Sequence, residues 1–231
     1  MQERRTPEQV SLRPMSDDSP GLYLFSPPLA HAGDFAPALQ EALAGGHVAS
    51  VYLDLSGLGD GEGARLAAPL VEIVQKAGAA ALVADARVAG RAKADGVHVR
   101  AAGDRLERAL EDALESMRPD RIVGAGLLRN KHDAMTAGEA DVDYVAFGEP
   151  SDDGWRPALA ETLERVGWWA EIFNVPCVAF AGALEETTAL VAAGADFVAL
   201  GAAVWDDPRG PRVAVAQADA LLKDAGRARA P

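Results

Sequence analysis

Two glycine-containing segments near the end of the sequence have the composition of anion-binding turns. The segments "FAGALEE" (180–186) and "ALGAAVW" (199–205) each place a glycine directly after an apolar stretch. Glycine leaves the backbone N–H uncovered, and exposed amides at the start of a helix bind phosphate. The alternative is that these glycines only relieve crowding at a turn. We predict a phosphate-binding site formed by Gly182, Ala183, Gly201 and Ala202.

Two aspartates are candidate ligands of a metal ion. Asp85 ends one apolar run, and Asp104 lies just beyond the next. If both runs are parallel strands, the two carboxylates lie at the same end of the sheet and could hold one Mg2+ through oxygen ligands. Asp104 is equally suited to be the N-cap of the helical segment that follows it, and this alternative stays open. The predicted cofactor is Mg2+, with Asp85 and Asp104 as its candidate ligands.

The histidines offer one candidate catalytic residue. His132 lies near the start of a helical segment, at the end of the sheet where the phosphate turns are expected, and is the candidate general base. A solvated surface histidine is the alternative interpretation. His98 lies between two valines and is expected to be packed and hydrogen-bonded rather than catalytic.

Short apolar runs that alternate with longer helical segments must position these residues. The runs cover residues 21–27, 48–55, 80–85, 96–99, 121–126, 144–148, 176–182 and 197–204. A helical segment follows each run, as in residues 34–46, where Asp34 is a suitable N-cap and Gly45-Gly46 a suitable stop. Eight such units predict an α/β protein with a single (β/α)8 TIM barrel. The alternative is a doubly wound open sheet, but the glycine-rich loop that usually follows its first strand is missing here.

A weak internal repeat supports the eightfold arrangement. Asp95, Asp143 and Asp196 each end a helical segment and begin an apolar run. Their separations are 48 and 53 residues, which is about two strand–helix units each. Since they begin strands, they lie at the end of a barrel opposite to the active site, and we expect them to have structural roles in turns.

Composition restricts the class of protein. The chain has 231 residues, of which 49% are hydrophobic and only 6% aromatic, and this suits helices packed closely on a parallel sheet. The net charge of -13 disfavours nucleic acid and anionic membranes as partners.

No apolar run reaches the roughly 18 residues needed to cross a bilayer, and no secretory signal is recognisable, so a cytoplasmic location is expected. Cys177 is the only cysteine, which excludes an internal disulfide.

The polarity of the two ends sets the expected domain boundaries. Residues 1–20 are polar and contain prolines, which predicts a flexible N-terminal arm. The TIM-barrel domain is expected over residues 21–226, followed by a C-terminal tail at 227–231. Within it, Trp168 and Trp169 are adjacent in a helical segment, so one is expected to pack on the barrel and the other to be exposed, where a homodimer contact would cover it.

The clearest pattern is a resemblance to a known family. The segments "KADGVHV", "DVDYVAFG" and "VPCVAFAGALEETTALVAAGADFVALGAAV" resemble, in order and spacing, those of the thiamine phosphate synthase and thiazole tautomerase family. The resemblance extends from Gly21 to about Gly226. It implies a TIM barrel linked to thiamine biosynthesis, and a synthase that joins hydroxymethylpyrimidine pyrophosphate to thiazole phosphate with the help of Mg2+.

The sequence departs from this family where the pyrophosphate would bind. The expected Gln-x-Arg-x-Lys after the second run falls on Tyr52, Asp54 and Ser56, so two cations become an acid and a hydroxyl. The Gly-Gln-x-Asp after the fourth run is one residue longer and leaves Asp104 as its acid. Further departures are Ala84 in place of an asparagine, Gly126 and Leu128 in place of Ser-x-His, and the acidic segment 148–157 in place of a loop with threonine and lysine.

These departures predict a degraded pyrophosphate site. A charge-assisted hydrogen bond to phosphate contributes about 1.5–3 kcal/mol, so the loss of several removes much of the binding. Arg87, Arg100 and Arg129 are candidate replacements for the missing cations. We therefore expect a divergent synthase-like barrel that binds a phosphorylated small molecule; if it is an enzyme, it is a transferase of the thiamine phosphate synthase type. The alternative is a non-catalytic phosphate-binding or regulatory barrel.

Overall fold

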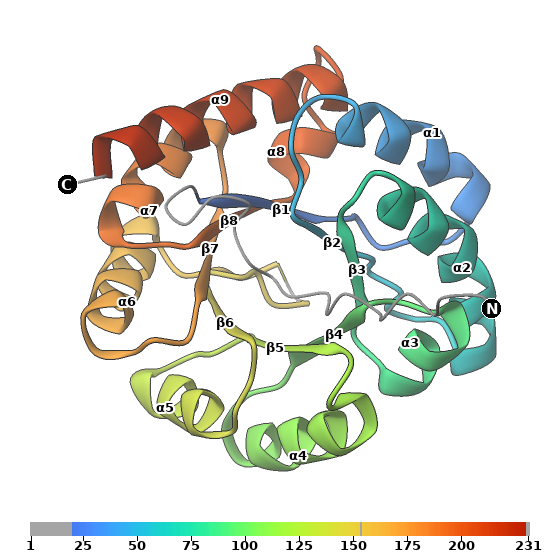
Figure 1. Ribbon diagram of the computed structural model, residues 1–231, viewed down its shortest axis with the longest axis horizontal. Coiled ribbons are helices and arrows are strands. Elements are labelled where there is room, and N and C mark those ends of the chain that lie inside the picture. The colour runs from blue at the N-terminus through green and yellow to red at the C-terminus, as the bar shows by residue number, and fades with distance from the viewer. Residues whose placement is uncertain (1–19, 153, 230–231) are drawn as a thin grey trace, which may run out of the picture.

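The computed structural model describes residues 20–152 and 154–229 and shows a closed barrel of parallel strands (Figure 1). The strands are β1 (Gly21–Phe25), β2 (Ser50–Tyr52), β3 (Ala80–Val83), β4 (Gly96–Arg100), β5 (Ile122–Gly126), β6 (Tyr144–Phe147), β7 (Cys177–Ala181) and β8 (Phe197–Leu200). Each strand pairs with the next in sequence, and β1 closes the barrel on β8, with Gly21 opposite Phe197. The predicted (β/α)8 TIM barrel is confirmed, and the open sheet is wrong.

Helices surround the barrel and alternate with its strands (Figure 1). They are α1 (Ala32–Leu43), α2 (Asp60–Lys76), α3 (Ala86–Ala92), α4 (Leu106–Met117), α5 (Lys131–Glu139), α6 (Leu159–Ile172), α7 (Thr187–Ala193), α8 (Ala202–Trp205) and α9 (Pro211–Arg229). Single turns of 3-10 helix, η1 (Gly103–Arg105) and η2 (Leu184–Glu186), precede α4 and α7. In the described chain, each strand is therefore followed by at least one helix.

Two local expectations are corrected. Helix α1 begins before Asp34, which therefore lies in the first turn while His31 occupies the N-cap position. The last apolar run is a strand only as far as Leu200, and the residues after Gly201 form helix α8. An apolar run alone does not distinguish a strand from a short helix whose inner face is buried. The predicted run 197–204 therefore includes both β8 and most of α8.

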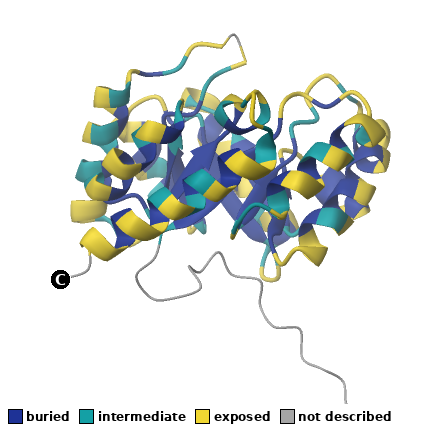
Figure 2. Ribbon diagram, turned by 90° about the horizontal axis from the view of Figure 1, so that it is seen from above, coloured by how far each residue is buried: buried dark blue, intermediate teal, exposed yellow. Residues whose placement is uncertain are grey.

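Two layers of side chains form the core. One lies between the sheet and the helices, whose inner faces are buried and outer faces exposed (Figure 2). The other fills the barrel interior and includes Tyr23, Tyr52 and Tyr144, all three tyrosines of the chain. A glycine makes room for one of these rings, because a Cβ on Gly124 would lie 1.9 Å from Cζ of Tyr144.

The three repeated aspartates connect neighbouring strands at the bottom of the barrel. Asp95, Asp143 and Asp196 precede β4, β6 and β8. Each carboxylate accepts a hydrogen bond from a backbone N–H of the preceding strand, and each aspartate N–H donates to the carbonyl of that same residue. The partners are Ala81, Val123 and Cys177, with N–H to carboxylate distances of 2.7, 2.7 and 2.8 Å. The predicted structural role is confirmed.

The tryptophan pair on α6 agrees with the prediction in its buried member, whereas the other ring is half-buried and packs against the core. Trp169 is buried, stacks on Phe173 with ring centroids 3.9 Å apart, and donates from Nε1 to the carbonyl of Val175. Trp168 is half-buried, and Nζ of Lys131 lies 5.0 Å from its ring centroid. The homodimer contact expected at Trp168 stays a prediction.

The described residues do not include the N-terminal arm. Residues 1–19 lie outside them, so the arm predicted over 1–20 stays a prediction. Helix α9 continues through residues 227–229, although their polarity predicted the start of a tail. Among the helices described, none combines the length and apolar character needed to span a membrane.

Candidate active site at the barrel mouth

The carboxyl ends of the strands enclose a cavity of about 460 Å3, here called the mouth cavity. In TIM barrels the active site lies at this end, because the loops that follow the strands meet there. The segment after β6 crosses the barrel opening in projection (Figure 1), and its residues Glu149, Pro150, Ser151, Asp152 and Gly154 line the cavity. Its lining includes the side chains of Phe25, Tyr52, Asp54, Ser56, Arg100, Glu149, Asp152, Phe180, Trp205 and Asp206.

Aromatic rings form the apolar part of the mouth cavity. The ring centroid of Phe25 lies 4.9 Å from that of Tyr52 and 5.3 Å from that of Phe180. Trp205, from α8, donates its Nε1–H to the carbonyl of Phe25 and so fixes its own ring at the rim. Flat aromatic walls of this kind suit a ligand with a planar ring.

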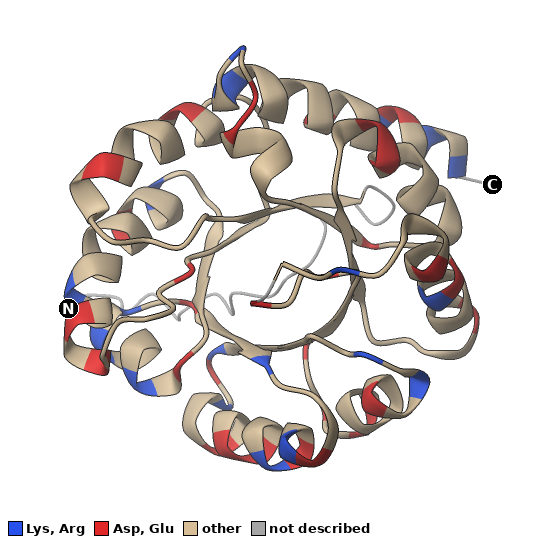
Figure 3. Ribbon diagram, turned by 180° about the vertical axis from the view of Figure 1, so that it is seen from behind, with Lys and Arg blue, Asp and Glu red and all other residues tan. Residues whose placement is uncertain are grey.

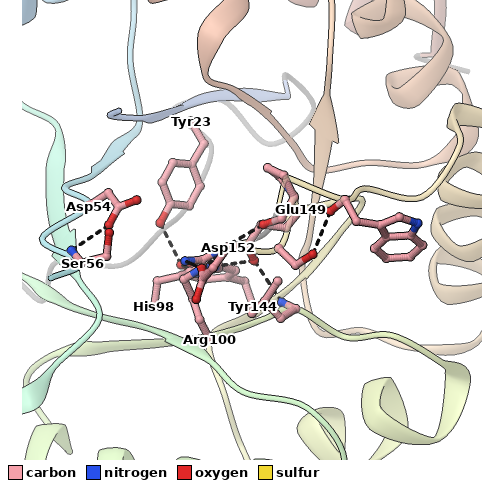
Figure 4. A network of polar contacts seen from close by, with 12 residues as sticks. Tyr23, Asp54, Ser56, His98, Arg100, Tyr144, Glu149 and Asp152 are labelled. Carbon is pink, nitrogen blue, oxygen red and sulfur yellow. Dashed lines mark hydrogen bonds and ion pairs between the residues drawn. The ribbon is translucent and has the colours of Figure 1, made fainter. Parts of the chain in front are cut away.

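An ion-pair network fills the opposite side of the mouth cavity (Figure 4). Arg100, at the end of β4, donates from Nε to Oε1 of Glu149 at 2.5 Å and from Nη1 to Asp152 at 2.7 Å. Its Nη2 donates to the carbonyl of Pro150 at 2.9 Å. These partners all belong to the segment after β6. Arg100 therefore anchors this segment over the barrel, and its guanidinium is already satisfied by protein groups.

The network continues from Glu149 into the barrel interior. His98 Nε2 lies 3.1 Å from Oε2 of Glu149, and His98 Nδ1 lies 2.7 Å from the hydroxyl of Tyr144. The hydroxyls of Tyr144 and Tyr23 lie 3.0 Å apart, and the N–H of Leu127 also donates to Oε2 of Glu149. His98 is fully buried, which confirms the prediction of a packed, hydrogen-bonded residue.

The protonation of this network follows from its surroundings. Burial by itself would raise the pKa of Glu149, but the charge and hydrogen bonds of His98 and Arg100 outweigh it and lower the pKa. Burial raises the pKa of the Tyr23 and Tyr144 hydroxyls well above their ordinary value. At neutral pH the network therefore holds a carboxylate anion among neutral tyrosines.

A pattern in the sequence could have predicted part of this network. His98 and Arg100 are two residues apart on one strand, so their side chains point to the same face. Two basic side chains directed at the barrel axis require an acid, and the segment after β6 supplies Glu149. Within the acidic segment 148–157, the structure shows that Glu149 is an internal counterion.

Acids outnumber cations around the mouth cavity. Within the described chain, its charged lining consists of Arg100 and four acids, Asp54, Glu149, Asp152 and Asp206. Asp54 and Ser56 lie where the family pattern has arginine and lysine, and the N–H of Ser56 donates to Oδ1 of Asp54 at 2.9 Å. The cavity surface is therefore anionic on the side where a pyrophosphate would be expected.

The predicted phosphate ligands divide into two pairs. Gly201 and Ala202 line the mouth cavity, whereas Gly182 and Ala183 are not part of its lining. The N–H of Gly182 donates to Oε2 of Glu186 at 2.6 Å. Nη2 of Arg156 lies 3.3 Å from each oxygen of Glu186, and this guanidinium covers Gly182. The carboxylate of Glu186 therefore accepts the hydrogen bond from the Gly182 N–H that a phosphate oxygen was expected to accept.

The predicted metal ligands Asp85 and Asp104 lie outside the lining of the mouth cavity. Oδ1 of Asp85 accepts hydrogen bonds from the N–H groups of Arg87 and Val88, as an N-cap of α3. Asp104 is exposed in η1 and makes no capping hydrogen bond to α4, so its N-cap role is wrong. Neither acid lines the cavity, and no group of three or more His, Cys, Asp or Glu in the described chain could hold a metal ion. No chemical step is therefore assigned to Mg2+.

The remaining candidates lie away from the mouth cavity. His132 is exposed at the start of α5 and is not among the residues that line the cavity. Arg87 is exposed and pairs with Asp60 on α2 at 3.5 Å. Arg129 lies after β5, outside the mouth cavity, in a second cavity described below. Of the proposed replacement cations, only Arg100 reaches the mouth.

The closed parallel barrel and the cavity at its carboxyl end define a TIM-barrel protein with a small-molecule site at the strand ends. The sequence profile of the family described as thiamine monophosphate synthase matches residues 22–204, and the chain belongs to this family. A thiamine-phosphate synthase of Rhodospirillum centenum is 38% identical over 87% of this chain and 97% of its own. One of Erythrobacter litoralis is 38% identical over 80% of this chain and 87% of its own.

The fold agrees with a solved structure of similar name. Thiamine phosphate pyrophosphorylase from Pyrococcus furiosus superposes with a TM-score of 0.72 at 21% identity, covering 89% of this chain and 96% of that chain. At this identity the similarity concerns the fold alone.

Proposed function

We propose that this chain binds a phosphorylated small molecule in the mouth cavity and is a divergent family member whose pyrophosphate site is degraded. The observation that carries the proposal is the charge of the lining, where four acids accompany a single arginine in the described chain. That arginine is held by Glu149, Asp152 and a backbone carbonyl. A leaving pyrophosphate would meet carboxylates in place of preplaced cations.

Magnitudes support the loss of the coupling reaction. A departing pyrophosphate gains negative charge in the transition state, and enzymes stabilise that charge with fixed donors and cations. Removing one such donor commonly lowers the rate by about 10²–10³. Two positions, Asp54 and Ser56, lack the expected cations, so the combined effect brings the rate near background.

The phosphate of the ligand is assigned to the ends of β7 and β8, against the backbone of Gly182, Ala183, Gly201 and Ala202. Arg156 supports this assignment, because its guanidinium already lies over Gly182 and is satisfied there by Glu186. A phosphate would take the place of the Glu186 carboxylate and would pair with the same N–H and the same guanidinium. The aromatic rings of Phe25 and Phe180 would then contact the ring of the ligand.

A second candidate function is the coupling reaction itself, which the names of the Rhodospirillum centenum and Erythrobacter litoralis relatives favour. The chain would then be a transferase that joins hydroxymethylpyrimidine pyrophosphate to thiazole phosphate. Mg2+ on Asp85 and Asp104, His132 as a general base, a homodimer and a cytoplasmic location stay predictions under either function.

Product formation from hydroxymethylpyrimidine pyrophosphate and thiazole phosphate, with Mg2+ present, tests the proposal. We expect turnover near background for the native chain, and the double variant Asp54→Arg, Ser56→Lys serves as the comparison that restores the two cations. Robust turnover by the native chain would show that the pyrophosphate site lies elsewhere and would establish the second function.

Binding is tested separately by thermal unfolding with thiazole phosphate, thiamine phosphate or pyrophosphate. A ligand at 100 times its dissociation constant stabilises the folded state by about 2.7 kcal/mol. We expect a shift with thiazole phosphate or thiamine phosphate, and Gly201→Asp should abolish that shift, since its carboxylate would project from the cavity lining. No shift with any of them would favour a barrel that acts through a different ligand or partner.

A further inference from the structure

A second cavity of about 610 Å3 lies beside the mouth cavity, at the ends of β4 and β5. It is here called the arginine cavity, because Arg100, Arg105 and Arg129 line it. Arg100, Ser151 and Asp152 line both cavities, so the segment after β6 separates them. The volume falls within the about 300–1,000 Å3 that is usual for small-molecule sites.

The two cavities have opposite charge. The arginine cavity has three arginines and, in the described chain, one acid, Asp152. Among its described lining residues, the mouth cavity has one arginine and four acids. Acidic and basic residues are otherwise mixed over the outer helices (Figure 3), so a local excess of arginines is not the general condition of this surface. In a chain of net charge -13, an excess of arginines in one cavity indicates a specific role for that cavity.

Two of these arginines have no side-chain partner within the part of the chain that the structure describes. Across the described residues, the side chains of Arg105 and Arg129 make no ion pair or hydrogen bond, and both side chains are exposed. The backbone N–H of Arg129 is used by Asp133, but its guanidinium is not. Arg87 and Arg156, by contrast, each pair with a carboxylate. Two unpaired guanidinium groups that face one cavity create a site for an anion supplied from outside.

The neighbouring helix adds to this charge. Helix α4 begins at Leu106 beside the cavity, and Arg105 occupies its N-cap position without a side-chain cap. The partial positive charge at the start of a helix attracts anions. The helix of 12 residues and the two guanidinium groups therefore act in the same direction.

We propose that the arginine cavity binds a phosphoanion, with Arg105 and Arg129 as its ligands and Arg100 as a fixed charge at its inner edge. Guanidinium groups bind phosphate through two parallel hydrogen bonds each, which suits the several oxygens of a pyrophosphate. This site is separate from the phosphate position proposed at β7 and β8. The proposal rests on the proposed function in one respect, namely that the ligands of this chain carry phosphate.

Calorimetric titration of the full chain with inorganic pyrophosphate, without Mg2+ and at low salt, tests this proposal. We expect saturable binding that weakens as salt is added, since the contacts are ionic. The double variant Arg105→Ala, Arg129→Ala should bind at least about 100-fold more weakly, because each guanidinium contact contributes about a factor of ten or more. The variant Arg105→Lys, Arg129→Lys keeps the charge and should recover part of the affinity.

A matched control removes the same charge elsewhere. Arg212 and Arg227 are exposed, on α9, and their double alanine variant should bind pyrophosphate as the native chain does. Gly201→Asp should also retain this binding, which separates the arginine cavity from the site at β7 and β8. Retained binding in the Arg105, Arg129 variant, or no saturable binding by the native chain, would overturn the proposal. Loss of binding in Gly201→Asp alone would place the anion at β7 and β8, and would leave the proposed function standing.

Discussion

Glu149 is the residue whose substitution tests the buried network most directly. Glu149→Gln keeps the size of the side chain but removes the charge that faces His98 and Arg100. Hydrogen bonds from these two residues and from the N–H of Leu127 end on this carboxylate, at 3.1, 2.5 and 3.0 Å. The carboxylate side chain is only 2% exposed, so water cannot replace them.

The expected cost follows from this geometry. Removing one partner of a buried ion pair costs about 3–5 kcal/mol, because a charge is left uncompensated. We expect about 3 kcal/mol, at the lower end of that range. Arg100 keeps Asp152 and the carbonyl of Pro150, and the glutamine keeps one acceptor oxygen.

The effect should depend on pH. Because the folded state lowers the pKa of Glu149, its contribution to stability is fully present above the unfolded pKa of about 4.3. The contribution is lost as the pH falls through the lower, folded pKa. The difference in the free energy of unfolding between the native chain and Glu149→Gln should therefore be constant near pH 7 and shrink below about pH 4.

Urea unfolding over this pH range measures the difference. Asp152→Asn is the control, because Asp152 also pairs with Arg100 but its side chain is 80% exposed, and such pairs contribute below about 1 kcal/mol. A cost for Glu149→Gln as small as that of the control would refute the reasoning. So would a difference that stays constant into the acid range.

Three further substitutions or reactions probe the barrel itself. Asp196→Ala should lower the free energy of unfolding by about 1–3 kcal/mol, because the N–H of Cys177 loses its acceptor. Chemical denaturation measures this loss, with the exposed-site variant Glu139→Ala as the control. Equal stability of the two variants would contradict the prediction. Gly124→Ala should destabilise by about 1–3 kcal/mol or more, because its Cβ would overlap the ring of Tyr144; an unchanged melting temperature would speak against the packing described. Burial raises the pKa of the Cys177 thiol to about 12, so iodoacetamide at pH 8 should modify it only after unfolding, and rapid labelling of the folded chain, followed by mass spectrometry, would contradict this.

The sequence by itself determined the barrel and its supporting framework. Strand and helix periodicity are local properties, and eight alternating units can bury their apolar faces on both sides of a parallel sheet only in a few ways. The three aspartates were assigned correctly because their position at strand starts depends only on chain order. That one of the adjacent Trp168 and Trp169 packs on the barrel followed in the same way from the apolar face of their helix, and the structure shows that it is Trp169. Strand ends were less certain, as the assignment of α8 shows.

Only the tertiary structure decided which side chains meet at the mouth. The contacts of His98 and Arg100 with Glu149 join residues 51 and 49 positions apart, and the hydroxyls of Tyr23 and Tyr144 are 121 apart. Such pairs depend on strand register and on the path of the segment after β6, which no local pattern specifies. The same holds for Arg156, which pairs with Glu186 30 positions away, and for Arg105 and Arg129, which come from separate segments to one cavity. Periodicity places a residue at an end of the barrel, but the electrostatics of a site depend on distances of a few ångströms, and these are set by the packing of the whole chain.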